Sequence, residues 1–324
     1  MKAKAVARAN IALAKYWGKS DDALNLPAVP SVSLTLDPLI TETSVTFDEA
    51  LQSDAFVLDG EPARAGEAAR VTALLDEVRA AAGLDARARV VSVNRFPTAA
   101  GLASSASGFA ALSAAASKAA GLDEPLEALS ARARRASASA ARSIWGGIVA
   151  LDAGVPGDDA LSARPVAPAD HWDLRVVVAI TATGRKPIGS RAAMAESRSS
   201  SPYYRAWVES CEALAPEIEQ ALRDRDFDAL APRVEQSFFA MHAVAMAGRP
   251  SVLYWQAGSV AAIHRIRQLR ADGVRVCATM DAGPHVKAIC AAEAVDQVRE
   301  ALAATEGVSD TLVATIGPGV EVEA

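Results

Sequence analysis

The chain has 324 residues, of which 51% are apolar and 22% charged, a composition typical of folded, soluble proteins. A single hydrophobic core stops growing near ~250–300 residues, so two lobes are expected. The net charge of −6 argues against a nucleic-acid-binding surface, because affinity for a phosphate backbone needs an excess of Lys and Arg.

The cysteines and the apolar runs indicate the compartment. Cys211, Cys277 and Cys290 are an odd number without CxxC spacing, which favours neither a disulfide framework nor a zinc site. Charged residues interrupt the N-terminal apolar runs, and no run approaches the ~18 residues of a membrane span. A cytoplasmic protein without membrane contact is therefore expected.

The first half of the chain predicts strands and then helices. Short alternating or apolar runs separated by Pro, Gly and Asp predict strands at 11–16, 32–36, 43–47, 56–58 and 89–93. Helical spacing of Leu and Val predicts one helix at 67–82. The Ala- and Ser-rich stretch 101–121 predicts a helix packed closely on a sheet, and a second helix follows Asp123 and Pro125.

The second half mixes long helices with strands. The apolar run Leu174–Ile180 predicts a buried strand, and the polar segment 184–202 predicts a crossing between lobes 1–184 and 185–324. Beyond it, the periodicity predicts helices at 204–225, 227–247, 254–272 and 291–304, and strands at 274–280, 286–289 and 311–316. This mixture indicates an α+β fold.

The segment 94–108 carries the first sign of chemistry. It places a turn with Gly101 between a strand and a helix, and small hydroxyl residues follow. Amides and the dipole at a helix start attract phosphate, although an N-capped helix without a ligand is equally supported by these residues alone. The segment lacks the spacing of the Walker and dinucleotide loops.

Two further segments carry charged groups near strand ends. In a strand, Lys15, Trp17 and Lys19 would share one face and Tyr16 the other, giving a cluster of anion ligands or merely solvated lysines. Asp281 follows a strand and precedes Ala-Gly-Pro. It is a candidate general base, although the pattern alone favours an ordinary turn residue.

Four segments, in the same order as in a known family, carry a resemblance over nearly the whole chain: 10–19, 94–108, 137–147 and 279–284. They resemble the GHMP kinase superfamily and, within it, the diphosphomevalonate decarboxylases. The resemblance implies an N-terminal lobe like ribosomal protein S5 and a ferredoxin-like C-terminal lobe that carries Asp281. It also implies a homodimer.

The resemblance further implies ATP with Mg²⁺ as co-substrate and mevalonate 5-diphosphate as substrate. The implied ATP-binding residues are Pro97, Ala100, Gly101, Leu102, Ala103, Ser104, Ser105 and Ser107, with Ser104 or Ser105 near the magnesium ion. The implied substrate-binding residues are Tyr16, Lys19, Ser137, Ser139, Arg142, Ser190 and Arg191.

In the implied reaction, Asp281 deprotonates the C3 hydroxyl, which takes the γ-phosphoryl group, and loss of phosphate and CO₂ then yields isopentenyl diphosphate. Lys15 lies beside Asp281, Asn10 orients the substrate, and Arg142 grips one of its anionic groups. The residues alone do not single out Arg142, which is expected to project into open space. Ser190 would equally serve as the N-cap of a helix at 192–196.

The chain departs from the family pattern at Ala136 and Ala138, where glycine is usual, at Ala141, and at His285, where Asn is common. Two alternatives remain within the superfamily: a phosphomevalonate decarboxylase and a mevalonate-type kinase. A non-catalytic phosphometabolite sensor is the alternative from another class.

Overall fold

The strand β4 (Ser31–Asp48) organises the main sheet of the computed structural model, which describes residues 1–96, 104–182 and 188–323. The strand β1 (Lys2–Ala14) runs antiparallel along one edge of β4. On the other edge, β4 pairs in turn with β8 (Ile148–Leu151), β13 (Asp310–Ile316) and β7 (Arg87–Asn94). This long strand therefore pairs with strands from both the first and the last parts of the chain.

Shorter strands complete this mixed sheet, whose main path runs β11-β12-β10-β13-β4-β7-β5-β6. Their bounds are β5 (Ala55–Leu58), β6 (Glu61–Pro62), β9 (Arg164–Ala167), β10 (Leu174–Ile180), β11 (Val276–Met280), β12 (Val286–Ala291) and β14 (Glu321–Glu323). A separate hairpin is formed by β2 (Lys19–Asp21) and β3 (Leu26–Pro27).

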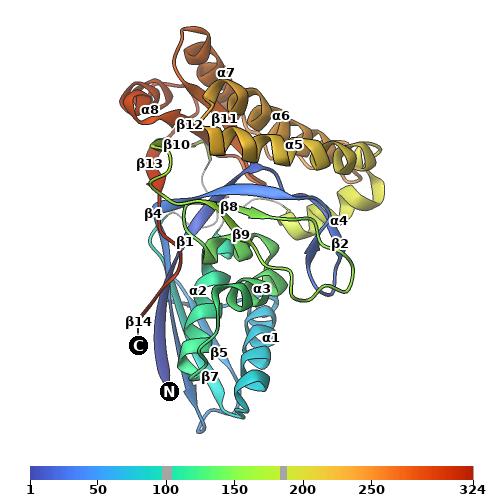
Figure 1. Cartoon of the computed structure of the whole chain (residues 1–324), viewed down its shortest axis with the longest axis vertical. Coiled ribbons are helices and arrows are strands. Elements are labelled where there is room, and N and C mark those ends of the chain that lie inside the picture. The colour runs from blue at the N-terminus through green and yellow to red at the C-terminus, as the bar shows by residue number, and fades with distance from the viewer. Residues whose placement is uncertain (97–103, 183–187, 324) are drawn as a thin grey trace.

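Helices pack in two groups, one at each end of the sheet (Figure 1). The first group is α1 (Ala65–Ala82), α2 (Ser104–Ala119), α3 (Leu126–Ala136) and the 3₁₀ helix η1 (Ala138–Ile144). The second is α4 (Ser190–Ser200), α5 (Tyr204–Asp224), α6 (Phe227–Met246), α7 (Ala257–Ala271), the 3₁₀ helix η2 (Ala292–Ala294) and α8 (Val295–Ala303). Small Ala and Ser side chains let α2 lie buried close to β1 and β4.

The predicted α+β class is confirmed, and the bounds of β10 agree with the predicted strand. The prediction was wrong in separating strands at 32–36 and 43–47, because both belong to β4. Pro38 suggested a break between them. The register against β1 instead shifts between Arg8 and Ala9, opposite Pro38, so the missing N–H falls at an irregularity of the ladder.

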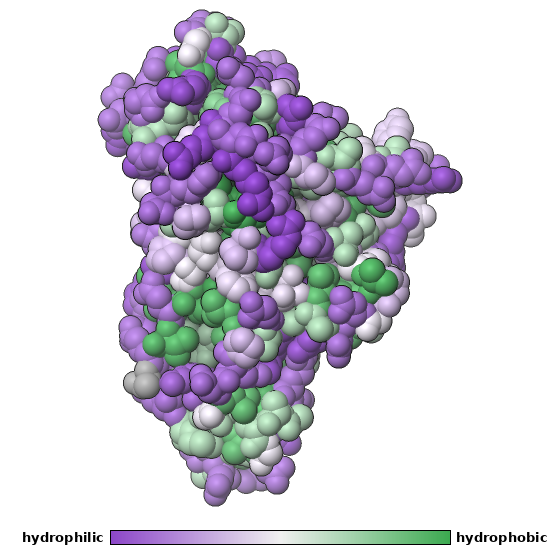
Figure 2. Space-filling view, in the orientation of Figure 1, coloured by the Kyte–Doolittle hydropathy of each residue, from purple (hydrophilic) through white to green (hydrophobic). Residues whose placement is uncertain are grey.

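The division into lobes 1–184 and 185–324 stays a prediction. Within the sheet, β10 lies between β12 and β13, while β13 also pairs with β4. In the described parts of the chain, no helix is long and apolar enough to cross a membrane. Hydrophilic residues cover most of the face seen in Figure 2, between smaller hydrophobic patches.

Candidate active site

A cleft with an open volume of about 940 Å³ lies where the end of β1, the 3₁₀ helix η1, the start of α4 and the turn after β11 meet. These four segments are far apart in the chain. Eleven of the residues predicted to bind or react line it: Asn10, Lys15, Tyr16, Lys19, Ser105, Ser137, Ser139, Arg142, Ser190, Arg191 and Asp281. The tertiary fold therefore gathers most of the described candidates in one place.

The side chains of Lys15 and Asp281 form an ion pair on one wall of the cleft. Lys15 Nζ donates to Asp281 Oδ1 at 2.8 Å and to the carbonyl oxygen of Ala12 at 2.6 Å. The side chain of Lys15 is only 1% exposed, whereas that of Asp281 is 24% exposed. The carboxylate is therefore reachable from the cleft, and its partner is held behind it.

The surroundings lower the pKa values of both members of this pair, for different reasons. Burial lowers the pKa of Lys15 to about 8, although the charge of Asp281 works against this shift. Burial alone would raise the pKa of Asp281, but the charges of Lys15 and Lys287 outweigh it and hold that pKa below its usual value. Asp281 is consequently ionised at neutral pH, as an acceptor of protons must be.

Asn10 and Arg142 form a second polar cluster on the cleft wall. Asn10 Nδ2 donates to Ser139 O at 3.0 Å and to Ser143 Oγ at 2.7 Å. Arg142 donates to the hydroxyls of Ser33 and Ser31 at 3.0 and 2.6 Å. Contrary to the expectation from sequence, Arg142 does not project into open space but is 2% exposed. Burial lowers its pKa to about 10, which still leaves it charged.

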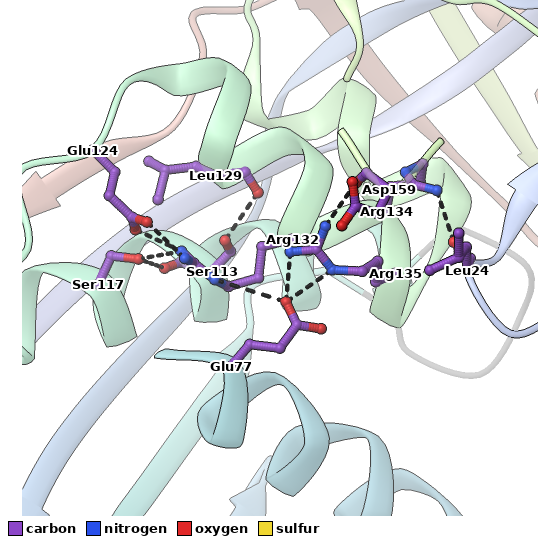
Figure 3. A network of polar contacts seen from close by, with 10 residues as sticks. All are labelled: Leu24, Glu77, Ser113, Ser117, Glu124, Leu129, Arg132, Arg134, Arg135 and Asp159. Carbon is purple, nitrogen blue, oxygen red and sulfur yellow. Dashed lines mark hydrogen bonds and ion pairs between the residues drawn. The ribbon is translucent and has the colours of Figure 1, made fainter. Parts of the chain in front are cut away.

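The neighbouring arginines of α3 have structural partners (Figure 3). Arg132 makes a bidentate pair with Glu124, Arg135 pairs with Glu77, and Arg134 donates to the carbonyl oxygens of Leu24 and Asp159. In contrast, no carboxylate of the described residues lies within ion-pair distance of Arg142. A buried cation without a counter-charge is costly, so an anionic ligand is the expected partner of Arg142.

The outer part of the cleft is also cationic. Lys19 and Arg191 line it, and Arg191 Nη2 donates to the carbonyl oxygen of Ala136 at 3.2 Å. Burial and the charge of Arg191 lower the pKa of Lys19. Tyr16 lines the same region, and its hydroxyl has no partner among the described residues. These groups form a pocket ready for a multiply charged anion.

Two local predictions are wrong. β1 ends at Ala14, so strand alternation does not continue to Lys19. Trp17 is instead buried, with its indole N–H donating to Ser197 Oγ. Ser190 is not an N-cap: Gly189 occupies that position without a side-chain hydrogen bond, and Ser190 is the first residue of α4. Its side chain is therefore available to the cleft.

A second pocket, with an open volume of about 540 Å³, adjoins the start of α2. Its walls combine apolar side chains, among them Phe56, Leu58 and Phe109, with polar residues that include Asn94, Ser104 and Ser105. Ser105 and Arg70 line both this pocket and the main cleft. The two spaces therefore adjoin, and we call the second one the α2 pocket.

The predicted ATP-binding residues fall into two groups. Pro97, Ala100, Gly101, Leu102 and Ala103 lie outside the described residues. Ser104 and Ser105 line the α2 pocket, whereas the Ser107 hydroxyl is buried 2.6 Å from Thr41 Oγ1 and lines neither space.

Within the described residues, no cluster of three His, Cys, Asp or Glu side chains is placed to hold a metal. The hydroxyls of Ser104 and Ser105 and the carboxylate of Glu67, all on the α2 pocket, are hard oxygen donors. They suit Mg²⁺ that arrives with nucleotide phosphates and keeps few protein ligands.

Comparison with known families identifies the chain. Residues 7–162 match the model of the diphosphomevalonate decarboxylase-like N-terminal domain, and residues 176–316 match that of the mevalonate 5-diphosphate decarboxylase C-terminal domain. The chain belongs to the diphosphomevalonate decarboxylase family. This confirms the resemblance inferred from the four sequence segments.

Members of the diphosphomevalonate decarboxylase family match over most of the chain. Phosphomevalonate decarboxylase of Haloferax volcanii is 35% identical and covers 94% of this chain and 92% of its own length. Human diphosphomevalonate decarboxylase is 36% identical, covering 85% and 73% respectively. A solved structure described as MDDEF in complex with MVAPP, AMPPCP and magnesium has a TM-score of 0.93 and 38% identity, covering 100% of this chain and 99% of its own.

At the positions that depart from the pattern of diphosphomevalonate decarboxylases, the substituted residues introduce no charge at pH 7. Ala138 lines the cleft, and Ala141 is fully buried. His285 is also buried, and its Nδ1 accepts a hydrogen bond from the backbone N–H of Thr181 at 3.2 Å. Burial lowers its pKa to about 4, so it is neutral at pH 7.

Sequence reasoning missed several residues at the site. Arg70, Asn25, Met194 and Met241 line the main cleft, and Lys287 lies behind Asp281. Arg70 is an arginine within the amphipathic helix α1, like Arg79, so no local signal marks it. Lys287 did carry a signal, because it is the single charged residue within the apolar strand 286–291.

Proposed function

We propose that the chain catalyses the ATP-dependent decarboxylation of mevalonate 5-diphosphate to isopentenyl diphosphate, with release of ADP, phosphate and CO₂. The observation that supports this most is the ionised, cleft-facing Asp281 beside Lys15, in a cleft that, among the described residues, is lined by five cationic side chains and one carboxylate. That local charge contrasts with the net charge of −6 for the whole chain. It suits a substrate with several negative groups.

In the first step, the C3 hydroxyl oxygen attacks the γ-phosphorus of ATP, its proton passes to Asp281, and ADP leaves. Lys15 holds the carboxylate in place, and its positive charge stabilises the ionised form before the transfer. Phosphoryl transfer depends mainly on positioning and electrostatics, so the cations of the cleft are expected to contribute most of the rate enhancement. Mg²⁺ supplies charge neutralisation at the nucleotide phosphates when bound.

In the second step, the C3–O bond breaks and phosphate leaves with the electron pair. Positive character develops at the tertiary carbon, and the C–C bond to the carboxylate then breaks. Its electrons form the new double bond, and CO₂ is released. Arg142 is placed to hold that carboxylate, because its guanidinium is buried beside Asn10 and no carboxylate of the described residues lies within ion-pair distance of it.

The two ends of the cleft suit the two substrates. Tyr16, Lys19 and Arg191 are placed to bind the diphosphate group. At the other end, the α2 pocket offers apolar walls for the nucleoside, next to the start of α2, where helix amides favour phosphate. Arg70 lines both spaces and is therefore placed to contact the phosphates between them.

A phosphomevalonate decarboxylase is the second candidate, since a relative with that activity matches 94% of the chain. The two activities differ in one phosphate group at the outer end of the cleft. Lys19, Arg191 and the hydroxyl of Tyr16 all line this part of the cleft, and that hydroxyl has no partner among the described residues. This set of groups favours the diphosphate, because a monophosphate would leave some of them without an anionic partner.

The product assay tests this proposal. With ATP, Mg²⁺ and mevalonate 5-diphosphate, purified protein should release CO₂ and ADP in equal amounts, and the monophosphate should be turned over less efficiently. ADP without CO₂ would indicate a kinase, and a higher kcat/KM for the monophosphate would favour the second candidate. Binding of ATP without any ADP would indicate a sensor.

The variant Asp281→Asn tests the role of the carboxylate. An amide keeps the shape of the side chain but cannot accept the hydroxyl proton, so turnover should fall to background while ATP affinity measured by calorimetry stays within about twofold. Asp281→Asn protein that retains activity would exclude Asp281 as the base.

Family resemblance also supports a homodimer and a cytoplasmic location. Light scattering coupled to size-exclusion chromatography tests the first, and a monomer mass of 33.5 kDa at micromolar concentration would exclude a stable dimer.

A further inference from the structure

Lys287 is a buried lysine that the reaction outlined above does not use. It lies on β12, where its residue pairs with Thr279 of β11, two positions before Asp281. Its side chain is 2% exposed, and its Nζ lies 3.9 Å from Asp281 Oδ2. Lys287 is not among the residues that line the cleft, so it lies behind Asp281 as seen by a ligand.

The two lysines approach different oxygens of the same carboxylate. Lys15, at the end of β1, donates to Oδ1, and Lys287, from β12, faces Oδ2. The short bond from Lys15 fixes one oxygen. The longer contact with Lys287 is an ion pair that acts by charge and disfavours rotation of the carboxylate group.

The other titratable groups around this pair do not replace Lys287. Arg142 of η1 is charged but is bonded to serine hydroxyls on the cleft wall. His242 of α6 and His285, which precedes β12, are both buried, and burial lowers their pKa values to about 3 and 4. Both are neutral at pH 7, so Lys287 is the second charge compensating Asp281 after Lys15.

A buried ammonium is costly, and a methionine in its place would pack with less penalty. The reaction explains why a charged lysine is kept at position 287, and this inference rests on the proposed function. Phosphate and carboxylate groups that enter the cleft bring negative charge close to Asp281 and compete with it for the charge of Arg142. Lys287 is out of their reach and continues to balance the carboxylate.

We propose that Lys287 is a positioning residue that acts through Asp281, fixing its second oxygen and keeping it ionised when anionic substrates fill the cleft. Lys287 does not contact the substrates. Its loss should therefore affect kcat and the pH dependence of the reaction, and leave the KM for either substrate nearly unchanged.

The first test compares Lys287→Met with Lys287→Arg. In Lys287→Met, kcat should fall on the order of tenfold or more, and the pH of half-maximal kcat on the acidic side should rise by roughly half a unit or more, because the pKa of Asp281 rises without the lysine. Lys287→Arg should restore the wild-type acidic limb. If Lys287→Met does not fold, Lys287→Gln carries the same test.

The second test does not depend on activity. Replacing Lys287 by Met should raise the urea midpoint more in the Asp281→Asn background than in the wild type, because the lysine has lost its counter-charge there. An equal change in both backgrounds, or an unshifted acidic limb in Lys287→Met, would overturn the inference. Wild-type protein that releases no CO₂ would instead contradict the proposed function and leave the urea comparison valid.

Discussion

Lys15 Nζ lies 2.8 Å from Asp281 Oδ1, although 266 positions separate the two residues in the chain. Lys15 follows the end of β1 and Asp281 follows the end of β11, so the ends of two strands from distant parts of the chain meet at the cleft. The pair is asymmetric, because its lysine is buried and its carboxylate faces the cleft. This asymmetry leaves only the acidic partner available to react.

The protonation of Lys15 should set the alkaline limit of activity. Burial lowers its pKa to about 8, so above that pH Lys15 loses its charge and Asp281 its main counter-ion. The kcat/KM for mevalonate 5-diphosphate, which reports the free enzyme, should therefore fall as the pH rises through about 8. In Lys15→Arg the activity at pH 7 will be lower, but the alkaline limb should move up by more than one unit, since Arg stays charged. If the alkaline limb of the pH profile does not move in Lys15→Arg, a group other than Lys15 sets the alkaline limit.

Replacing Arg142 should lower activity without lowering the stability of the fold. Arg142→Met should lower kcat/KM on the order of 100-fold, because a buried cation bound to an anionic substrate is lost. The urea midpoint of the ligand-free protein should stay the same or rise, since the buried charge that is removed has no ion-paired carboxylate among the described residues.

Arg132→Met is the matched control for Arg142→Met. It breaks the bidentate pair with Glu124 and should lower the free energy of unfolding by roughly 2 kcal/mol. Equal destabilisation by both substitutions would contradict the distinction between a binding arginine and a structural one.

Replacing Arg70 should weaken the binding of ATP more than the binding of mevalonate 5-diphosphate. Its guanidinium lies 4.8 Å from the ring centroid of Phe109, at the junction of the cleft and the α2 pocket. Arg70→Met should raise the KM for ATP on the order of tenfold, with a smaller change for mevalonate 5-diphosphate. The exposed Arg64, just before α1, gives the control Arg64→Met, which should behave as the wild type. A selective rise in the KM for mevalonate 5-diphosphate would show that Arg70 binds this substrate rather than ATP.

The buried His242 should make the fold sensitive to acid. Burial lowers its pKa from 6.5 to about 3, so between these values the unfolded chain binds a proton that the folded chain does not. The free energy of unfolding should therefore fall as the pH falls through this window, by at most about 1.4 kcal/mol per pH unit from this group. In His242→Phe, which keeps the ring packed near Trp255, urea unfolding at pH 5 and 7 should show a smaller loss. The same loss in both proteins would exclude His242 as the source.

Local patterns in the sequence were sufficient for much of the fold. The apolar run 174–180 became β10 because burial on both faces leaves no polar position in the strand centre. The long helices α5 and α6 followed their 3.6-residue periodicity to within one residue of the predicted ends. Pro38 misled the prediction of β4, because a register shift against β1 accommodates it.

What the sequence determined by itself is the family, the α+β class and the identity of most residues that line the cleft, because motifs and periodicity are local properties of the chain. Only the tertiary structure decided that Arg142 is buried with no described carboxylate at ion-pair distance, that Arg70 joins two pockets, and that Lys287 lies behind Asp281. Each of these depends on contacts between segments far apart in the chain, and the charge and solvation of a side chain are set by such contacts rather than by its sequence neighbours.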